Sequence, residues 1–204
     1  MKKYLILLLF ILPSFTQGQS LQAYQSTFNG ALKNWTQTFT GFDLANFKPV
    51  GAPSQFLNTD IVQAKNKTTF YPIYKRALTT SPNWQYVIDS YAYLFLEKKQ
   101  GRFTTTGSDV EQSIRLGNVR QSKWRQIAYY GYDQRLEEVI WVNNDTFILA
   151  ASRLNKANKN IPVIIIGHIK RQSLTTFETA DPDCYQKAVG YTSPKLNQLL
   201  QGKP

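Results

Sequence analysis

Histidine and cysteine, the side chains that most often act as general base and reactive thiol, are scarce in this 204-residue chain. His168 is the only histidine and Cys184 the only cysteine. A hydroxyl nucleophile usually requires a positioned base, most often histidine, and a reactive thiol requires a neighbour that lowers its pKa. We interpret His168 as a sheet residue, because on its expected strand it shares a face with Ile164, Ile166 and Lys170. We interpret Cys184 as an inert thiol, because no histidine or second cysteine lies near it in the sequence. The sequence therefore predicts no catalytic residue.

Paired carboxylates could catalyse hydrolysis or bind a metal ion, but the sequence shows no pair that is expected to face one another. Glu137 and Glu138 are adjacent, and on a regular strand adjacent side chains point to opposite faces, which would keep them apart. Asp181, Asp183 and Cys184 lack the second cysteine or nearby histidine of a zinc site and the repeated acidic residues of a calcium loop. The Gly-x-Ser-x-Gly, His-Glu-x-x-His, Ser-x-x-Lys and phosphate-loop motifs are absent from the sequence. We expect neither a metal site nor a cofactor.

The basic residues form the clearest chemical pattern. The chain has 24 Lys and Arg against 13 Asp and Glu, for a net charge of +11, which favours encounter with anionic partners. In an antiparallel meander alternate turns lie at the same end, so one end should gather the candidate anion-binding residues Lys98, Lys99, Arg102, Arg135, Arg153, Lys156 and Lys159. The other end should gather Arg120, Lys123, Arg125, Lys170 and Arg171. The competing interpretation is ordinary solvation of strand turns.

A proline-rich and aromatic segment over 41–84 is predicted to be a long irregular connection. Connections of this length inside a compact domain are often functional. We select as candidates for an aromatic groove Phe70, Tyr71, Tyr74 and Trp84. The alternative is aromatic packing beneath the loop.

An amphipathic helix is predicted over 19–40, because apolar residues recur there at spacings of three and four. This apolar stripe contains Leu21, Tyr24, Phe28, Leu32, Trp35 and Phe39. Residues 181–204 are predicted to form a turn and a short helix that opens at Ser193-Pro194. Residues 85–180 between these elements should form the main body of the fold.

Residues 85–180 are predicted to form seven strands separated by turn residues. The expected strands are Gln85–Glu97, Asp109–Leu116, Trp124–Tyr132, Glu137–Asn143, Thr146–Leu154, Pro162–Lys170 and Leu174–Glu178. No helix-length segment separates them, which favours an antiparallel seven-stranded meander in a twisted open sheet. The continuously apolar Val163–Ile166 run indicates a strand covered on both faces. Asn143-Asn144-Asp145 is predicted to be a tight hairpin turn with a left-handed backbone.

The stretch from Leu136 to Ala151 resembles part of a β-propeller blade, with Val139, Trp141 and Val142 on one strand and the aliphatic Phe147-Ile148-Leu149 on the next. A propeller needs at least four blades of four strands, which seven strands cannot supply. The resemblance therefore implies blade-like hairpins within an open meander that has the N-terminal helix on one face. It brings no active-site residues with it.

Residues 1–18 have the features of a secretory signal peptide. Lys2 and Lys3 precede a nine-residue apolar run, and Thr16-Gln17-Gly18 provides a small-residue cleavage site. The run is too short to span a bilayer, and no cysteine stands at the cleavage site to carry a lipid. We expect removal of 1–18, a single β-rich domain over 19–204 with no transmembrane anchor, and a periplasmic or secreted location. Loss of the two lysines lowers the net charge from +11 to +9.

These features together favour an exported, non-catalytic protein, either a binding protein or an envelope-associated protein, whose ligand the sequence does not identify. The partners suggested by its charge are an anionic envelope polymer or an acidic protein, and export disfavours nucleic acid. Two alternatives stay open at this point. One is a secreted hydrolase that uses carboxylates, with 56–84 as its substrate wall, and the other is a periplasmic inhibitor or immunity protein.

Overall fold

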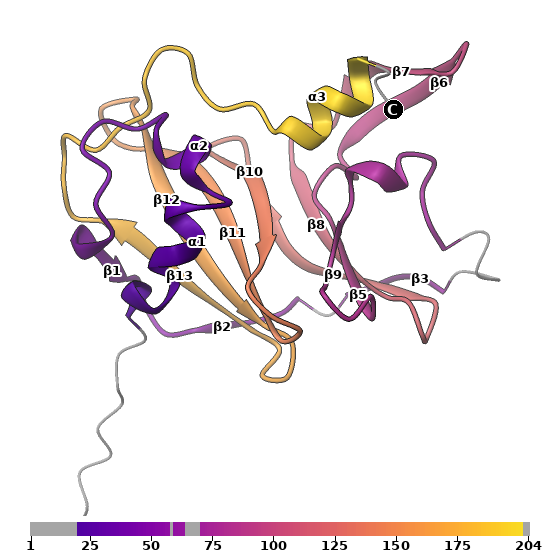
Figure 1. Cartoon of the computed structure of the whole chain (residues 1–204), viewed down its shortest axis with the longest axis horizontal. Helices are drawn as coiled ribbons and strands as arrows, with labels where there is room; N and C mark the ends of the chain where they lie inside the picture. Colours follow the sequence, from indigo (N-terminus) through magenta and orange to yellow (C-terminus); the bar gives the residue numbers. More distant parts are fainter. Residues whose placement is uncertain (1–19, 58, 64–69, 202–204) are drawn as a thin grey trace, which may run out of the picture.

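The computed structural model describes residues 20–57, 59–63 and 70–201, so the predicted signal peptide lies outside the described residues. The chain is mainly β, and the pairings between its described strands are antiparallel (Figure 1). The larger sheet has the order β1-β13-β12-β11-β10, and β2 also pairs with β13. Its strands are β1 (Phe47–Pro49), β2 (Ser54–Gln55), β10 (Gln134–Trp141), β11 (Thr146–Leu154), β12 (Asn160–His168) and β13 (Ser173–Thr179).

A second sheet has the order β3-β9-β8-β5-β4, and a separate hairpin is formed by β6 and β7. The strands are β3 (Thr59–Gln63), β4 (Thr79–Thr80), β5 (Tyr86–Asp89), β6 (Leu94–Lys99), β7 (Arg102–Ser108), β8 (Gln112–Asn118) and β9 (Lys123–Tyr130). The predicted single seven-stranded meander therefore differs from the structure. Strands β10 to β13 do form a continuous meander, but β9 and β10 belong to different sheets.

The strand predicted over Gln85–Glu97 is divided because the chain turns sharply after Asp89. The Asp89 carboxylate accepts a hydrogen bond from the Tyr91 backbone N–H, 2.9 Å away. This side-chain oxygen takes the place of the backbone carbonyl of a neighbouring strand. The chain then leaves the second sheet and forms the β6–β7 hairpin, whose second strand the sequence did not reveal.

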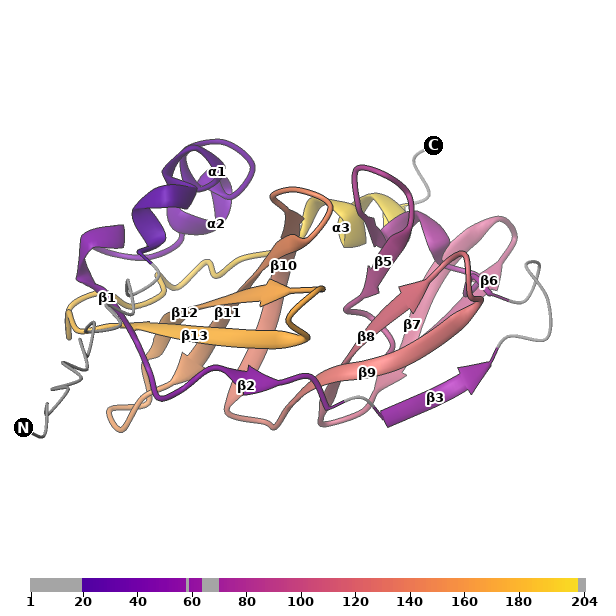
Figure 2. The same cartoon turned by 90° about the horizontal axis from the view of Figure 1, so that it is seen from below.

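The main hydrophobic core lies between the two sheets (Figure 2). The second sheet contributes Ile88, Ile114, Leu116 and Ile127, and the larger sheet contributes Leu136, Val139, Phe147, Leu149, Val163 and Ile165. The buried Gln112 side chain joins the sheets, because its amide donates to the Leu136 carbonyl and accepts from the Leu136 N–H at 3.2 and 2.7 Å. This paired polar contact costs little to bury.

The other face of the larger sheet is covered by the N-terminal segment (Figure 1). The predicted apolar stripe is largely buried here, but the continuous helix is replaced by three short pieces: η1 (Leu21–Tyr24), α1 (Gln25–Asn29) and α2 (Lys33–Thr36). Gly30 ends α1 with backbone angles of −105° and −98°, outside the helical range. Glycine has no Cβ, so it adopts these angles at little steric cost and the helix ends there. Short 3₁₀ turns follow at η2 (Leu44–Asn46) and η3 (Lys75–Ala77).

Strand β12 is covered on both faces, as its apolar run predicts. Val163 and Ile165 face the core between the sheets, whereas Ile164 and Ile166 pack under the N-terminal segment. All four side chains are at most 2% exposed. The alternation of a one-faced strand is absent here because both faces exclude water.

The β10–β11 turn lies where the sequence predicts it, but it has a different basis. None of Asn143, Asn144 and Asp145 has a positive φ. The Asn143 side-chain oxygen instead accepts from the backbone N–H groups of Asp145 and Thr146, each at 2.8 Å. The turn is thus an Asx-type turn, in which a side chain replaces a backbone acceptor.

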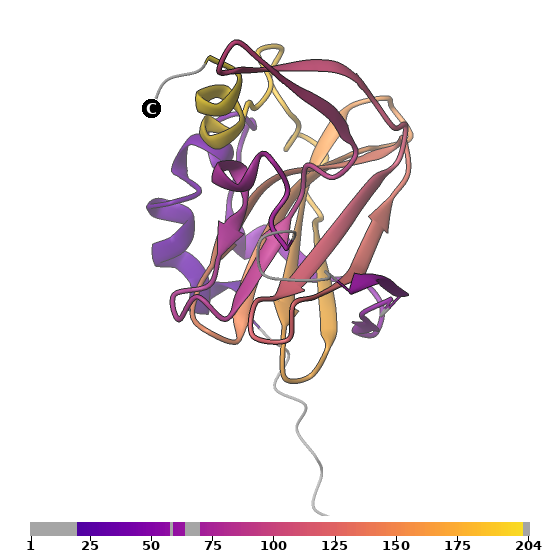
Figure 3. The same cartoon turned by 90° about the vertical axis from the view of Figure 1, so that its right-hand side faces the viewer.

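The C-terminal segment leaves the larger sheet and ends in α3 (Pro194–Gln201) near the β6–β7 hairpin, as predicted for a helix that opens at Ser193-Pro194 (Figure 1). Helix α3 packs against β7 and η3 beside the hairpin (Figure 3). No helix in the described part of the chain is long and apolar enough to cross a bilayer.

The Tyr130 hydroxyl is buried with no hydrogen-bond partner among the described residues. Replacing Tyr130 by phenylalanine should remove this desolvation cost and raise the free energy of unfolding by about 1 kcal/mol, measured by urea denaturation. Tyr91→Phe is the matched control, because the Tyr91 hydroxyl donates to Ser193 Oγ at 2.8 Å and its loss should destabilise the fold. If both substitutions lowered the free energy of unfolding to the same extent, the Tyr130 hydroxyl could not be a buried group without a hydrogen-bond partner.

Candidate functional site

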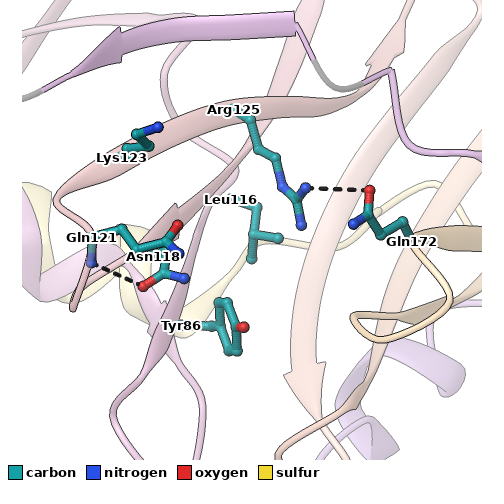
Figure 4. A pocket seen from close by; sticks show the side chains of 7 residues that line it. All are labelled: Tyr86, Leu116, Asn118, Gln121, Lys123, Arg125 and Gln172. Atoms are coloured by element: carbon teal, nitrogen blue, oxygen red, sulfur yellow. Dashed lines mark hydrogen bonds between the residues drawn. The ribbon is translucent and has the colours of Figure 1, made fainter.

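A pocket of about 330 Å³ opens at the end of the second sheet where β8 turns into β9 (Figure 4). It is lined by Tyr86, Leu116, Asn118, Gln121, Lys123, Arg125 and Gln172. We name it the cationic pocket, because two of these side chains are cationic and none is a carboxylate. Three amide side chains supply further hydrogen-bond donors and acceptors.

Arg125 is held in position from two sides. Its guanidinium lies 5.4 Å from the centre of the Phe56 ring and donates to Gln172 Oε1 at 3.4 Å. Gln172 lies in the β12–β13 turn and has a left-handed φ of +52°. Through this hydrogen bond, a turn of the larger sheet contacts strand β9 of the second sheet. An aromatic face and an amide together orient the guanidinium, which lowers the entropy it would lose on binding an anion.

The segment that follows β2 closes this end of the molecule. The Phe56 N–H donates to the Gln172 carbonyl at 2.7 Å, and the Leu57 N–H donates to the Ile127 carbonyl at 3.3 Å. Phe56 is thereby hydrogen-bonded to the β12–β13 turn of the larger sheet, and Leu57 to strand β9 of the second sheet. Because Phe56 is also part of the core, the pocket is built on a packed base.

The candidate anion-binding residues selected from the sequence do not form one group. Lys98, Lys99 and Arg102 lie on the β6–β7 hairpin, whereas Lys156 and Lys159 lie in the β11–β12 turn on the opposite side of the molecule (Figures 1 and 2). The hairpin is a separate two-stranded sheet, so the expected alignment of alternate turns does not extend to it.

Several of these cations are already engaged. Arg153 forms an ion pair with Glu178 at 2.6 Å, and Lys99 pairs with Glu97 at 2.8 Å. The Lys159 ammonium lies 3.9 Å from the centre of the Tyr185 ring. These contacts favour local structural roles over a shared site for Arg153, Lys99 and Lys159. Arg135 lies on β10, at the end of the larger sheet next to the β9–β10 loop.

The aromatic candidates differ in their contacts within the described part of the chain. Phe70 is 3% exposed and stacks on Trp124 with ring centres 5.0 Å apart. Tyr71 packs edge-on against Phe70, and the Tyr74 hydroxyl donates to the buried Asp89 at 2.9 Å. Trp84 is 74% exposed and does not belong to the hydrophobic cluster that contains Phe70 and Tyr74. The first three therefore match the alternative interpretation of aromatic packing beneath a loop.

His168 and Cys184 occupy structural positions. His168 is buried at the end of β12, where its Nδ1 lies 3.2 Å from Thr146 Oγ1, and burial together with the nearby Arg171 lowers its pKa. Cys184 is 1% exposed, and burial raises the pKa of its thiol to about 11. A neutral buried thiol is a poor nucleophile, in agreement with the inert role predicted for it.

The two adjacent glutamates do not point to opposite faces, because a β-bulge interrupts β10. The register with β11 shifts between Leu136 and Glu138, which leaves Glu137 as the extra residue. Glu137 accepts from Trp35 Nε1, Ser152 Oγ and Gln186 Nε2 at 2.7–3.1 Å. Glu138 accepts from the C-terminal segment, including the Tyr191 hydroxyl at 2.8 Å.

Burial raises the pKa of Glu137, and its three hydrogen bonds oppose this rise. The side chain thus joins the N-terminal segment, β11 and the C-terminal segment at one point. Among residues 20–57, 59–63 and 70–201, no group of three or more His, Cys, Asp or Glu side chains is placed to hold a metal ion.

Sequence reasoning finds part of the cationic pocket but favours the other end of the molecule. It places Lys123 and Arg125 near the β12–β13 turn, where the structure also has them. Gln172 and Tyr86 carry no sequence signal, because only the packing of the two sheets brings them beside Arg125. Comparison with known proteins found no matching family, no similar curated protein and no similar solved structure.

Proposed function

We propose that this protein is an exported, non-catalytic binding protein whose cationic pocket holds an anionic group of an envelope polymer. The observation that carries the proposal is the convergence of Arg125, Lys123 and Gln172 from two sheets around one concavity. The charge surplus of the chain supports it, because a positive field raises the rate of encounter with an anion. Export rests on residues 1–18 alone.

The chemistry of the pocket suits a carboxylate or phosphate that is attached to a polar body. A guanidinium binds such groups through two parallel hydrogen bonds, and a lysine adds a second positive charge. The amides of Asn118, Gln121 and Gln172 can pair with hydroxyl groups next to the anion. An acidic sugar unit has both features, so an acidic polysaccharide is the polymer we favour.

The hydrolase alternative is supported less well. It requires two carboxyl groups that face one another in a cleft beside the aromatic residues of 56–84. Glu137 and Glu138 are instead engaged with the N-terminal and C-terminal segments. An inhibitor or immunity protein would bind an acidic protein, and the same pocket variants test that partner.

Replacing both cations of the pocket, in the variant Lys123→Gln with Arg125→Gln, should weaken binding of oligogalacturonate at least tenfold. The loss of charge-assisted hydrogen bonds, worth about 1.5–3 kcal/mol each, gives the expected size. Isothermal titration calorimetry at low and physiological salt measures the change. The matched control, Lys33→Gln with Lys156→Gln, removes the same net charge from two exposed side chains, one in α2 and one in the β11–β12 turn.

The control should change the affinity less than twofold. Equal weakening by the control would show that net charge, and not the pocket, holds the polymer. Failure of the unmodified protein to bind oligogalacturonate, a glycerol phosphate polymer and acidic proteins would overturn the proposed function.

A further inference from the structure

Two pockets meet at the opposite end of β9, around the loop that leads into β10. One has a volume of about 310 Å³ and the other about 360 Å³. Both are lined by Tyr132 and Arg135, so they adjoin each other at these two side chains. Tyr132 is 84% exposed, so most of its aromatic ring is open to a ligand.

The larger of the two pockets contains a hydrogen-bond network that is already ordered. Asn160 Nδ2 donates to Gln186 Oε1 at 3.4 Å, and Gln186 Nε2 donates to Glu137 Oε1 at 2.9 Å. Trp35 Nε1 fixes the other carboxylate oxygen at 2.7 Å. These side chains come from separate parts of the chain and hold one another in place, which reduces the entropy cost of binding.

The charge of this end differs from that of the cationic pocket. The exposed Arg135 is accompanied by the carboxylates of Asp133 and Glu137 in the lining of the larger pocket. A simple anion would therefore be repelled as well as attracted. A hydroxyl group both donates and accepts hydrogen bonds. It can therefore pair with an amide, which also does both, and with a carboxylate, which accepts.

From these observations we propose that the two pockets around Tyr132 form a second binding site, for a neutral oligosaccharide. The exposed Tyr132 ring would cover the apolar C–H face of one sugar ring, because an aromatic side chain has an apolar body and a polar tip. Asn160, Gln186 and Glu137 would pair with hydroxyl groups in the larger pocket. The smaller pocket, where Gln112 and Gln134 also contribute to the lining, would hold the next unit.

This site is independent of the proposed anion site. The two lie at opposite ends of β9, with Lys123 and Arg125 at one end and Tyr130 just before the loop at the other. A protein that holds both a neutral unit and an acidic unit could contact a mixed polysaccharide at two points. Either site can nevertheless be tested without the other.

The test is an NMR titration of the ¹⁵N-labelled protein with tetra-N-acetylchitotetraose, a neutral oligosaccharide. Amide shifts should change at 131–135 and 186–191, and Tyr132→Ala should weaken the affinity at least tenfold. Trp84→Ala is the matched control, because Trp84 is another strongly exposed aromatic residue, outside these pockets, and its loss should change the affinity less than twofold.

The anion-site variant, with Lys123→Gln and Arg125→Gln, should keep full affinity for the neutral oligosaccharide. The proposal is overturned if millimolar oligosaccharide changes no shifts near Tyr132, or if Trp84→Ala weakens binding as much as Tyr132→Ala. Hydrolysis of the oligosaccharide, seen as new reducing-end signals, would also overturn a purely binding role and would point to Glu137 as an acid.

Discussion

Replacement of Glu138 by alanine should lower the free energy of unfolding by about 3 kcal/mol and release the C-terminal segment. Glu138 is 6% exposed and accepts hydrogen bonds from the Tyr191 hydroxyl, Ser193 Oγ and Lys195 Nζ at 2.8, 3.1 and 3.2 Å. Removing one member of a buried ion pair leaves the other charge uncompensated, which typically costs about 3–5 kcal/mol. We take the lower value because the Lys195 side chain is 32% exposed.

The effect of this change should extend to both sheets. Lys195 Nζ also donates to Thr79 Oγ1 and to the Val139 carbonyl, at 2.9 and 3.2 Å, so it contacts β4 and β10 together. Urea denaturation gives the stability, and amide hydrogen exchange over 191–201 reports release of the segment.

The matched control for Glu138 is Glu97→Ala, which removes a carboxylate from an exposed ion pair with Lys99. Side-chain exposures of 49% for Glu97 and 71% for Lys99 predict a change within about 0.5 kcal/mol. A loss of similar size in both variants would contradict the view that burial of Glu138 makes its contacts important.

Replacement of Gly167 by alanine should destabilise the fold by about 3 kcal/mol, at the upper end of the usual cost of overpacking. Gly167 lies opposite Phe147 in the β11–β12 ladder. An added Cβ would stand 2.1 Å from Phe147 Cζ, far inside van der Waals contact. The ring has little room to move, because it is fully buried and packs against Trp141 with ring centres 5.2 Å apart.

A second substitution distinguishes this clash from a loss of backbone freedom. Phe147→Leu makes room for the new methyl group, so the double variant should be at least about 1 kcal/mol more stable than the sum of the single changes predicts. Thermal and urea denaturation measure all three variants. Additive losses would show that the cost of Gly167→Ala lies in the backbone and not in contact with the ring.

The sequence by itself determined the local features of this protein. It predicted the antiparallel β character, the burial of β12 on both faces and the buried apolar stripe over residues 21–39. The two burial patterns follow from the period and extent of apolar residues, and the antiparallel pairing follows from the absence of helix-length connections between strands. Both kinds of signal depend on neighbours along the chain. The inert environment of Cys184 also followed from the absence of a second cysteine or a neighbouring base.

Only the tertiary structure decided how the strands divide into sheets and which polar residues meet. Asp89 ends β5 through a side-chain bond, the Glu137 bulge turns two adjacent carboxylates toward the terminal segments, and Gln172 approaches Arg125 across two sheets. Each contact joins residues that are distant in sequence or depends on a local break in strand geometry. Periodicity describes the face on which a side chain lies, but it contains no information about which strand will pack against that face.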